Sequence, residues 1–427
     1  MGEPDCTTLQ QTNCPDELQP VRLLFHLTES SSGSLQLSGE RRKSVYLITN
    51  EEENAVAAIS INRDGRLGQA SVTQTGGCGS VAVDAEGQPA VPDALIGQSA
   101  LTIAGNHLFA VNAGSNTVSM LAINPRDPLS LQLVGEPAAL PGTFPNTVAA
   151  SSKNSLVCVG MTGSKAGISC ANFDAQNGIG AMDDLRPFEI NQSDPPVGPL
   201  NTVSQTFFSE DQTTLFTTVK GDPAVNNTGF LSVFPVTAGN AADANACAQG
   251  AAGQIGTLSR EETRSSPAGT AVLFGSLPIP NSMPPQIFAT DASFGAAILN
   301  VDDSLNANLV ANQSIADQVA TCWVTISSFT KTAFVTDVAV NRIVEMSLTD
   351  ASIVGEIDLT QVAESSQDPG LIDLRAAGQF VYALSPGNGT TQAAISVVDA
   401  QSKQLVQHAQ LGAVGVGARA QGMTILV

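Results

Sequence analysis

One pattern of two short strands joined by a turn occurs seven times along the chain. Each copy has a run rich in β-branched or aromatic residues, a turn rich in Gly, Asn, Asp or Pro, and a second alternating run. Repeated hairpins at this spacing, with loop insertions, are typical of the blades of a β-propeller. The seven copies are VYLITNEEENAVAAISIN (from Val45), LFAVNAGSNTVSMLAIN (from Leu108), LVCVGMTGSKAGISCANF (from Leu156), LFTTVKGDPAVNNTGFLSVFPV (from Leu215), IFATDASFGAAILNV (from Ile287), AFVTDVAVNRIVEMSL (from Ala333) and VYALSPGNGTTQAAISVVD (from Val381).

A propeller blade needs four strands, and the remaining strands flank the hairpins. An inner strand precedes six of the hairpins, and an outer strand follows most of them. The first hairpin has no strand before it, but the chain ends on the strand-like sequence AQGMTILV, residues 420–427. If this strand completes the first blade, the ring closes without exposed edges. We therefore predict an all-β, seven-bladed β-propeller over residues 44–427, closed by its C-terminal strand, with residues 1–43 as an irregular N-terminal segment.

Ligands of propellers usually bind at the mouth of the central channel. We use "mouth" for the face that carries the outer-to-inner connections and the turns between second and third strands. Two insertions, residues 190–200 and 238–266, are predicted to rim it. The second strands are expected to end in Asn50, Asn112, Lys220, Asp291, Asp337 and Ser385, and the inner strands to begin near Gln98, Asn146, Asn201, Arg264, Trp323, Asp373 and Gln421.

Three of these residues are predicted to be catalytic. Trp323 can stack on a planar ligand, and Lys220 and Arg264 can bind a carboxylate or polarise a carbonyl oxygen. The competing interpretation is structural: the Trp packs between blades, and the two cations form salt bridges with Asp222 or Glu262, which are near them in sequence. The predicted substrate-binding residues are Asn112, Asn146, Asn201, Asp291, Asp337, Asp373 and Gln421.

The same Asn and Asp residues have a structural interpretation of their own, because such residues favour turns and cap strand ends. A calcium site built from Asn50, Asn112, Asp291 and Asp337 is a further alternative, since Ca²⁺ prefers oxygen ligands. Their spacing matches no metal-binding motif, so we predict neither a metal nor a cofactor.

The acidic composition excludes several classes of partner. The formal net charge is −21 and the pI is about 4.3. Such a surface repels phosphate backbones and anionic lipids, so we predict a small-molecule substrate, with no nucleic acid and no membrane as partner. No apolar run approaches the ~18 residues that cross a bilayer.

Cysteines and glycosylation sequons indicate a secreted protein, and we expect its signal peptide to have been removed. The alternative, buried reduced cysteines in a cytosolic protein, stays open. The predicted disulfides are Cys158–Cys170 across a hairpin, Cys6–Cys14 and Cys247–Cys322, which leaves Cys78 unpaired. The four N-x-S/T sequons, expected in exposed loops, begin at Asn191, Asn226, Asn312 and Asn388.

Several stretches resemble a known family. They include TNEEENAV, PDALIGQSALTIAGNHLFAVNAGSNTVSM, FPNTVAASSKNSLVCVG, KGDPAVNNTGFLSVFPV, TDASFGAA, VTDVAVNRIVEMSLTDASI and DPGLIDLRAAG. The chain is similar, over residues 44–427, to secreted fungal 3-carboxymuconate cyclase-like propellers, a group within the lactonase-type seven-bladed propeller family that includes a fungal surface antigen. The resemblance implies ring-opening or ring-forming chemistry on small organic acids.

The histidines depart from that family's pattern. Muconate cyclases of this fold use a His with Arg and Glu in the channel. Here His26 lies in the N-terminal segment, His107 in a turn on the far face, and His408 on an outer strand. We therefore expect no histidine acid–base catalysis at the mouth.

Three functions fit this pattern. The leading hypothesis is a cofactor-independent cyclase acting on an unsaturated small molecule of fungal secondary metabolism by a pericyclic, hetero-Diels–Alder ring closure. That chemistry needs orientation and carbonyl polarisation more than proton transfer. The alternatives are a lactonase or muconate-type lactonising enzyme, using Arg264 and a carboxylate or metal, and a non-catalytic secreted antigen or ligand-binding propeller. A channel filled by the protein's own side chains would contradict both enzyme hypotheses.

Overall fold

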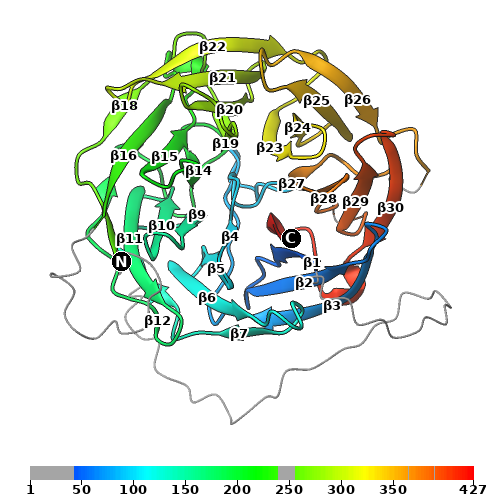
Figure 1. Ribbon diagram of the computed structural model, residues 1–427, viewed down its shortest axis with the longest axis horizontal. Helices are drawn as coiled ribbons and strands as arrows, with labels where there is room; N and C mark the ends of the chain where they lie inside the picture. Colours follow the sequence, from blue (N-terminus) through cyan, green and yellow to red (C-terminus); the bar gives the residue numbers. More distant parts are fainter. Residues whose placement is uncertain (1–42, 239–254, 364, 389) are drawn as a thin grey trace.

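The computed structural model describes residues 43–238, 255–363, 365–388 and 390–427. Within these ranges the chain forms seven antiparallel sheets in a ring, with their inner strands around a central axis (Figure 1). The helical elements of the described ranges are two short 3-10 turns, η1 (Pro223–Val225) and η2 (Gly412–Val414). The predicted all-β, seven-bladed propeller is confirmed.

We number the blades in chain order and give their strands from the axis outward. In blades 2 to 4 the outer edge is split into two short strands that pair with successive parts of the third strand. Blade 1 contains β31 (Gln421–Leu426), β1 (Lys43–Ile48), β2 (Ala55–Ile61) and β3 (Leu67–Gln74); blade 2 contains β4 (Leu101–Ala104), β5 (His107–Asn112), β6 (Thr117–Ile123), β7 (Leu131–Leu133) and β8 (Ala138–Ala139); blade 3 contains β9 (Pro145–Ser151), β10 (Leu156–Met161), β11 (Gly167–Asp174), β12 (Gly178–Ile179) and β13 (Arg186–Pro187).

Blades 4 to 7 follow the same order. Blade 4 contains β14 (Val203–Phe208), β15 (Thr214–Val219), β16 (Phe230–Ala238), β17 (Gly256–Leu258) and β18 (Thr263–Ser265); blade 5 contains β19 (Leu273–Pro278), β20 (Gln286–Asp291), β21 (Gly295–Val301) and β22 (Ala307–Ser314); blade 6 contains β23 (Thr321–Ser327), β24 (Thr332–Asp337), β25 (Arg342–Ser347) and β26 (Ile353–Asp358); blade 7 contains β27 (Ile372–Ala377), β28 (Phe380–Ser385), β29 (Ala394–Asp399) and β30 (Gln404–Gln410).

The ring is closed by the C-terminal strand, as predicted. β31 pairs antiparallel with β1, with Val45 opposite Ile425 and Ser44 opposite Leu426. Strands near the axis have apolar residues on both faces because neighbouring blades cover both sides of each sheet. Outer strands have one solvated face, and β22 alternates accordingly between less and more exposed positions. The alternation weakens toward the axis, where five of the six residues of β20 are buried.

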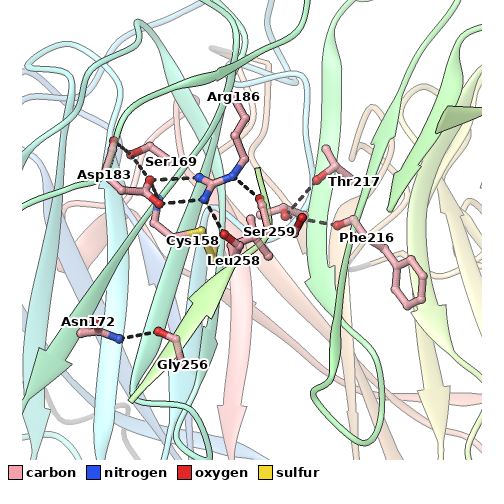
Figure 2. Close-up of a disulfide and its surroundings, with 12 residues drawn as sticks. Cys158, Ser169, Asn172, Asp183, Arg186, Phe216, Thr217, Gly256, Leu258 and Ser259 are labelled. Carbon is pink, nitrogen blue, oxygen red and sulfur yellow. Dashed lines mark hydrogen bonds and ion pairs between the residues drawn. A yellow bond between two sulfur atoms is a disulfide. The ribbon is translucent and has the colours of Figure 1, made fainter. Parts of the chain in front are cut away.

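The predicted disulfide Cys158–Cys170 is formed, and its residues lie directly opposite each other in the β10–β11 ladder. Figure 2 shows Arg186 beside it, on β13 at the outer edge of blade 3. Its guanidinium donates to both carboxylate oxygens of Asp183 and to the carbonyls of Leu258 and Ser259 in blade 4. This cluster therefore ties two neighbouring blades together.

The predicted pairing of Cys247 with Cys322 is wrong. Cys322 is a free, buried thiol on inner strand β23. An inner strand is far from the edge where the chain leaves β16 and returns in β17, and Cys247 itself lies outside the described residues. The Cys6–Cys14 pair also lies outside them. Cys78 is free and exposed, as predicted.

The insertion at residues 238–266 was also misplaced. Its described part forms β17 and β18, which pair with β16 as the outer edge of blade 4. Two three-residue strands are too short to show a period in the sequence. Of the four sequons, Asn312 lies in outer strand β22 and not in a loop; all four are exposed, at Asn191, Asn226, Asn312 and Asn388.

Candidate functional site at the axis

The inner strands are irregular near the mouth. The ladder between first and second strand shifts register at Asn146 in blade 3, Ser204 in blade 4, Cys322 in blade 6 and Asp373 in blade 7. A bulge leaves one residue unpaired and re-aims its side chain and backbone. The axis near the mouth is therefore lined by polar groups that the sheet ladders do not use.

Residues 92–100, which we call the axial segment, fill the axis. They belong to the connection from β3 to β4, and Figure 1 shows the chain entering β4 through the centre of the ring. Ala94 to Ala100 are buried, and Asp93 is partly exposed. The central channel is thus occupied by the protein's own chain. In this conformation it contradicts both enzyme hypotheses, and either activity requires that part of the axial segment moves out of the site.

The rear part of the segment, residues 98–100, is held mainly by backbone and amide bonds. Gln98 donates its backbone N–H to Ser204 O (2.9 Å). Its side-chain amide exchanges two hydrogen bonds with the backbone of Val324, at 2.9 and 3.2 Å. The carbonyls of Ser99 and Ala100 accept from backbone amides of β9 and β5. These residues are therefore an integral part of the ring.

The front part, residues 92–97, is bonded to the ring by side chains. Four donors from four different blades reach four of its carbonyl oxygens, and three of those carbonyls are consecutive. The bonds are Gln421 Nε2 to Pro92 O (3.1 Å), Asn146 Nδ2 to Leu95 O (3.3 Å), Lys220 Nζ to Ile96 O (2.5 Å) and Trp323 Nε1 to Gly97 O (3.4 Å). Four predicted site residues thus converge on one short stretch, which the sequence analysis did not foresee as their partner.

Lys220 is the buried cation of this site. It is 1% exposed, and its Nζ lies 4.2 Å from the centroid of the Phe274 ring. Burial lowers the pKa of Lys220 from 10.5 to about 8, with Asp93 acting in the opposite direction. The structure records no ion pair between Lys220 and Asp222, the partner that the structural alternative had required. Within hydrogen-bond distance, its recorded partner is the carbonyl of Ile96.

Two buried acids, Asp93 and Asp373, belong to the same electrostatic cluster: Asp93 interacts with Lys220, and Asp373 interacts with Asp93. Burial raises the pKa of Asp93 from 3.8 to about 7, and the nearby Lys220 limits the rise. Burial also raises the pKa of Asp373, against the effect of Arg375, whose Nη1 lies 2.5 Å from Asp373 Oδ1. Burial raises the pKa of the Cys322 thiol, so it stays protonated.

Some polar atoms at the axis have no hydrogen-bond partner within the described part of the chain. Buried polar groups are normally paired, so each exception needs an explanation, such as a ligand or an ordered water. On the axial segment and the inner and second strands these atoms are Ser44 Oγ, Asp93 Oδ1, Asn146 Oδ1, Thr336 Oγ1, Asp373 Oδ2 and Ser385 Oγ.

Arg264 does not begin an inner strand, contrary to the prediction. It lies exposed on β18, opposite Ser232 in the outer edge of blade 4. Its guanidinium pairs with Glu262 at 2.5 Å and lies 4.0 Å from the centroid of the Phe230 ring. The structural alternative, a salt bridge with Glu262, is therefore observed.

Four other predicted binding residues form hydrogen bonds that hold the loops at the mouth. Asp337 accepts from four backbone amides, and Asp291 accepts from backbone amides of Ala271 and Val272. Asn112 binds Asn54 and hydroxyl groups through both ends of its amide, and Asn201 bonds Ile190 O and Asn227. These contacts match the structural interpretation of the Asn and Asp residues.

Asp93 is the residue that sequence reasoning missed. It belongs to no strand, and although it stands at the start of the stretch PDALIGQSALTIAG that carries the family resemblance, the connection that contains it was not identified as an insertion. The unusual length of the connection between β3 and β4, with Pro92 beside Asp93, was the available signal.

The two histidines of the described ranges lie away from this site. His107 begins β5 on the far face, and His408 on β30 contacts Asp368 at 3.0 Å; His26 lies outside the described residues. Within the described ranges, no group of three or more His, Cys, Asp or Glu residues is arranged to hold a metal ion. The same part of the chain contains no helix long and apolar enough to cross a membrane.

Comparisons with known proteins define the fold class. No family model and no curated protein matches the sequence. A putative 6-phosphogluconolactonase from Bacteroides fragilis aligns with a TM-score of 0.59 at 11% identity, covering 92% of this chain and 100% of that one. A periplasmic gluconolactonase from Pseudomonas aeruginosa aligns with a TM-score of 0.58 at 12% identity, covering 91% and 99%. The chain therefore has the fold of lactonase-like seven-bladed propellers.

Proposed function

We propose that the protein is a lactonase-type enzyme that binds the carbonyl group of a small organic acid or lactone at the axis. The observation that carries this proposal is the convergence of Asn146, Lys220 and Trp323 on three consecutive carbonyl oxygens. Side-chain donors aimed at one carbonyl region in a buried site are what stabilises the oxyanion of acyl transfer.

The acid–base role falls to Asp93. As a carboxylate it takes a proton from water, whose oxygen attacks the lactone carbonyl while Lys220 and Trp323 donate to the developing oxyanion. The ring C–O bond then breaks, and the leaving alkoxide takes the proton from Asp93, so that lactone and water give the hydroxy acid. A carboxyl with a pKa of about 7 is present in both forms near neutral pH, which suits a group that accepts and returns a proton.

The likeness to two structures described as lactonases supports this choice over the pericyclic cyclase. Both reactions use donors that polarise a carbonyl, but lactone hydrolysis also uses Asp93. The pericyclic, cofactor-independent ring closure stays a prediction. In the present conformation Trp323 packs edge-on to Phe274, with ring centroids 5.1 Å apart.

The second candidate function is non-catalytic ligand binding, which the filled axis favours. The buried residues 98–100 close the axis with bonds to several blades. A rigid closed ring needs no channel to present its mouth loops to a ligand. Secretion is a separate proposal, supported by the Cys158–Cys170 disulfide and the exposed sequons.

The deciding experiment measures hydrolysis of glucono-δ-lactone and a muconolactone between pH 6 and 9. We expect kcat/KM to rise as Asp93 loses its proton near pH 7 and to fall as Lys220 loses its proton near pH 8. Asp93→Asn should lower kcat by roughly 10²–10⁴-fold.

For the variant Lys220→Met the matched control is Lys153→Met. Lys153 also donates to a backbone carbonyl, but it is exposed and far from Asp93 in sequence. Lys153→Met should leave the rate unchanged. Wild-type rates equal to those of Asp93→Asn would support the non-catalytic function. Ring closure of a polyene substrate that survives Asp93→Asn but not Lys220→Met would support the pericyclic cyclase.

A further inference from the structure

We propose that residues 94–97 are a built-in ligand that occupies the site and leaves when substrate binds, while Asp93 stays in place next to Pro92, whose carbonyl is bonded to Gln421. This inference rests on the proposed function because both use the same hydrogen-bond donors, Asn146, Lys220 and Trp323. It adds that the natural ligand carries a carboxylate and a second carbonyl in a 1,4 relationship, as in a 4-oxo acid.

The spacing of the donors defines this class. Consecutive peptide carbonyl carbons are separated by two atoms, the amide nitrogen and Cα, which is the 1,4 relationship. The carbonyls of Leu95, Ile96 and Gly97 are three such groups in series, each bonded to a different blade. A 4-oxo acid can therefore place its carboxylate on Lys220 and its ketone on Asn146 or Trp323.

The charges favour replacement of the peptide by an acid. A peptide carbonyl is neutral and leaves the charge of Lys220 uncompensated, whereas a carboxylate forms a charge-assisted hydrogen bond. The titratable groups that act on Lys220 are Asp93 and Cys322; Asp373 in turn acts on Asp93 and is paired with Arg375. Arg375 already compensates Asp373, so an anion bound to Lys220 meets mainly the repulsion of Asp93, which protonation removes.

The front part can move without the rear part. Its residues 94–97 are bonded to the blades by three side chains, and two of these bonds are 3.3 Å or longer. A backbone bond from Ala82 N–H to Ala94 O (2.8 Å) also holds them, and it comes from the same connection between β3 and β4. Residues 98–100 are fixed by backbone bonds, so the hinge lies between Ile96 and Gln98. Ile96 has a φ of 50°, a strained conformation for a β-branched residue, which opening relieves. The burial of Leu95 and Ile96 keeps the segment closed until a ligand binds.

Trp323 provides the readout, because it is the only tryptophan and its indole N–H contacts Gly97 O. The experiment titrates the full chain with levulinate, a 4-oxo acid, and with pentanoate, which lacks the ketone. Trp323 fluorescence is followed together with hydrogen exchange of residues 90–97 and 98–104. We expect a saturable emission change with levulinate and exchange faster by on the order of tenfold in residues 90–97 alone. Pentanoate should bind more weakly.

Two variants test the assignment. Lys220→Met should weaken levulinate binding by on the order of a hundredfold, whereas Lys153→Met should leave it unchanged. Ile96→Gly removes the strained side chain but keeps the carbonyl, so it should open more readily. Unchanged emission and exchange in both wild type and Ile96→Gly would overturn the proposal, as would equal responses to levulinate and pentanoate.

Measuring both hydrogen exchange and lactone turnover distinguishes failure of the built-in ligand from failure of the proposed lactonase function. Lactone turnover without faster exchange of residues 90–97 would overturn the built-in ligand and leave the lactonase. Ligand-induced exchange without turnover would support the built-in ligand and overturn the lactonase.

Discussion

Arg186 and Lys220 are both buried cations of this propeller, but their surroundings differ. Arg186 is 5% exposed and makes four hydrogen bonds, two of them to the Asp183 carboxylate (Figure 2). Lys220 is 1% exposed, and its recorded hydrogen bond goes to a single backbone carbonyl. The charge of Arg186 is compensated by a carboxylate, and Lys220 has only a neutral carbonyl as its recorded hydrogen-bond partner.

The difference separates a structural charge from a functional one. A buried charge is tolerated when it is paired and its hydrogen bonds are made. Arg186 meets both conditions at the outer edge, where blades 3 and 4 join. Lys220 meets neither in full, and a buried group with a strongly shifted pKa is a candidate functional residue. The largest losses of stability should therefore come from backbone closure and from the outer edge, not from the polar side chains at the axis.

Loss of the closing strand is expected to reduce the stability of the fold more than any other change considered. Deletion of residues 420–427 removes the inner strand of blade 1 and leaves β1 without its partner. The ring then has an open edge next to the axis, and we expect loss of cooperative folding, measured by circular dichroism and thermal melting. A truncated chain that melts like the full one would show that strand closure is not required.

Arg186→Met comes next. The substitution takes the cation from Asp183, which keeps its bonds from Ser169 and Cys170, and leaves the carbonyls of Leu258 and Ser259 without the donor that Arg186 supplied. We therefore expect a loss of about 3–5 kcal/mol in the free energy of unfolding. Urea denaturation measures it. The control is Arg260→Met, since Arg260 pairs with Asp184 in an exposed bridge and should cost at most about 1 kcal/mol. Equal losses would mean that the burial of Arg186 does not matter.

The disulfide beside Arg186 should contribute slightly less. Cys158 and Cys170 are separated by 12 positions, and closing a loop of this size stabilises by about 3 kcal/mol in the chain-entropy account. We expect the double variant Cys158→Ala, Cys170→Ala to lose about that amount in urea denaturation, with a small further cost from the buried sulfurs. A variant as stable as the reduced wild type is the internal check, because both lack the cross-link.

The strands and hairpins could be predicted from the sequence because they follow a local hydrophobic period. The positions of residues on connecting loops could not, because loops have no such period. Hairpins such as that from Val45, and the closing strand at residues 420–427, follow from alternation of apolar residues. Arg264 was placed on an inner strand because the short strands β17 and β18 carry no detectable period. Asp93 was missed because no pattern tells that a connection turns inward and crosses the axis.

The same limit explains the candidate site. Asn146, Lys220, Trp323 and Gln421 were identified from their places at strand ends, and their convergence was expected. Their partner was expected to be a ligand and is instead residues 92–97. Which oxygen atoms satisfy a donor is decided by tertiary contacts, which a strand-by-strand analysis does not contain.

Lys220→Met should have the smallest effect at neutral pH and the most specific dependence on pH. Replacing an incompletely paired buried charge by an apolar side chain of similar size is often neutral or stabilising, so we expect a change within about 1 kcal/mol in the free energy of unfolding.

The pKa of Lys220 is 10.5 when unfolded and about 8 when folded. Between these values the unfolded chain binds a proton that the folded chain lacks, so wild-type stability rises with pH, by at most about 1.4 kcal/mol per unit. Lys220→Met lacks this rise. The measurement is the difference between the two unfolding free energies from pH 8 to 10.5; a constant difference would show that Lys220 is solvated in the folded protein and that the contrast with Arg186 is false.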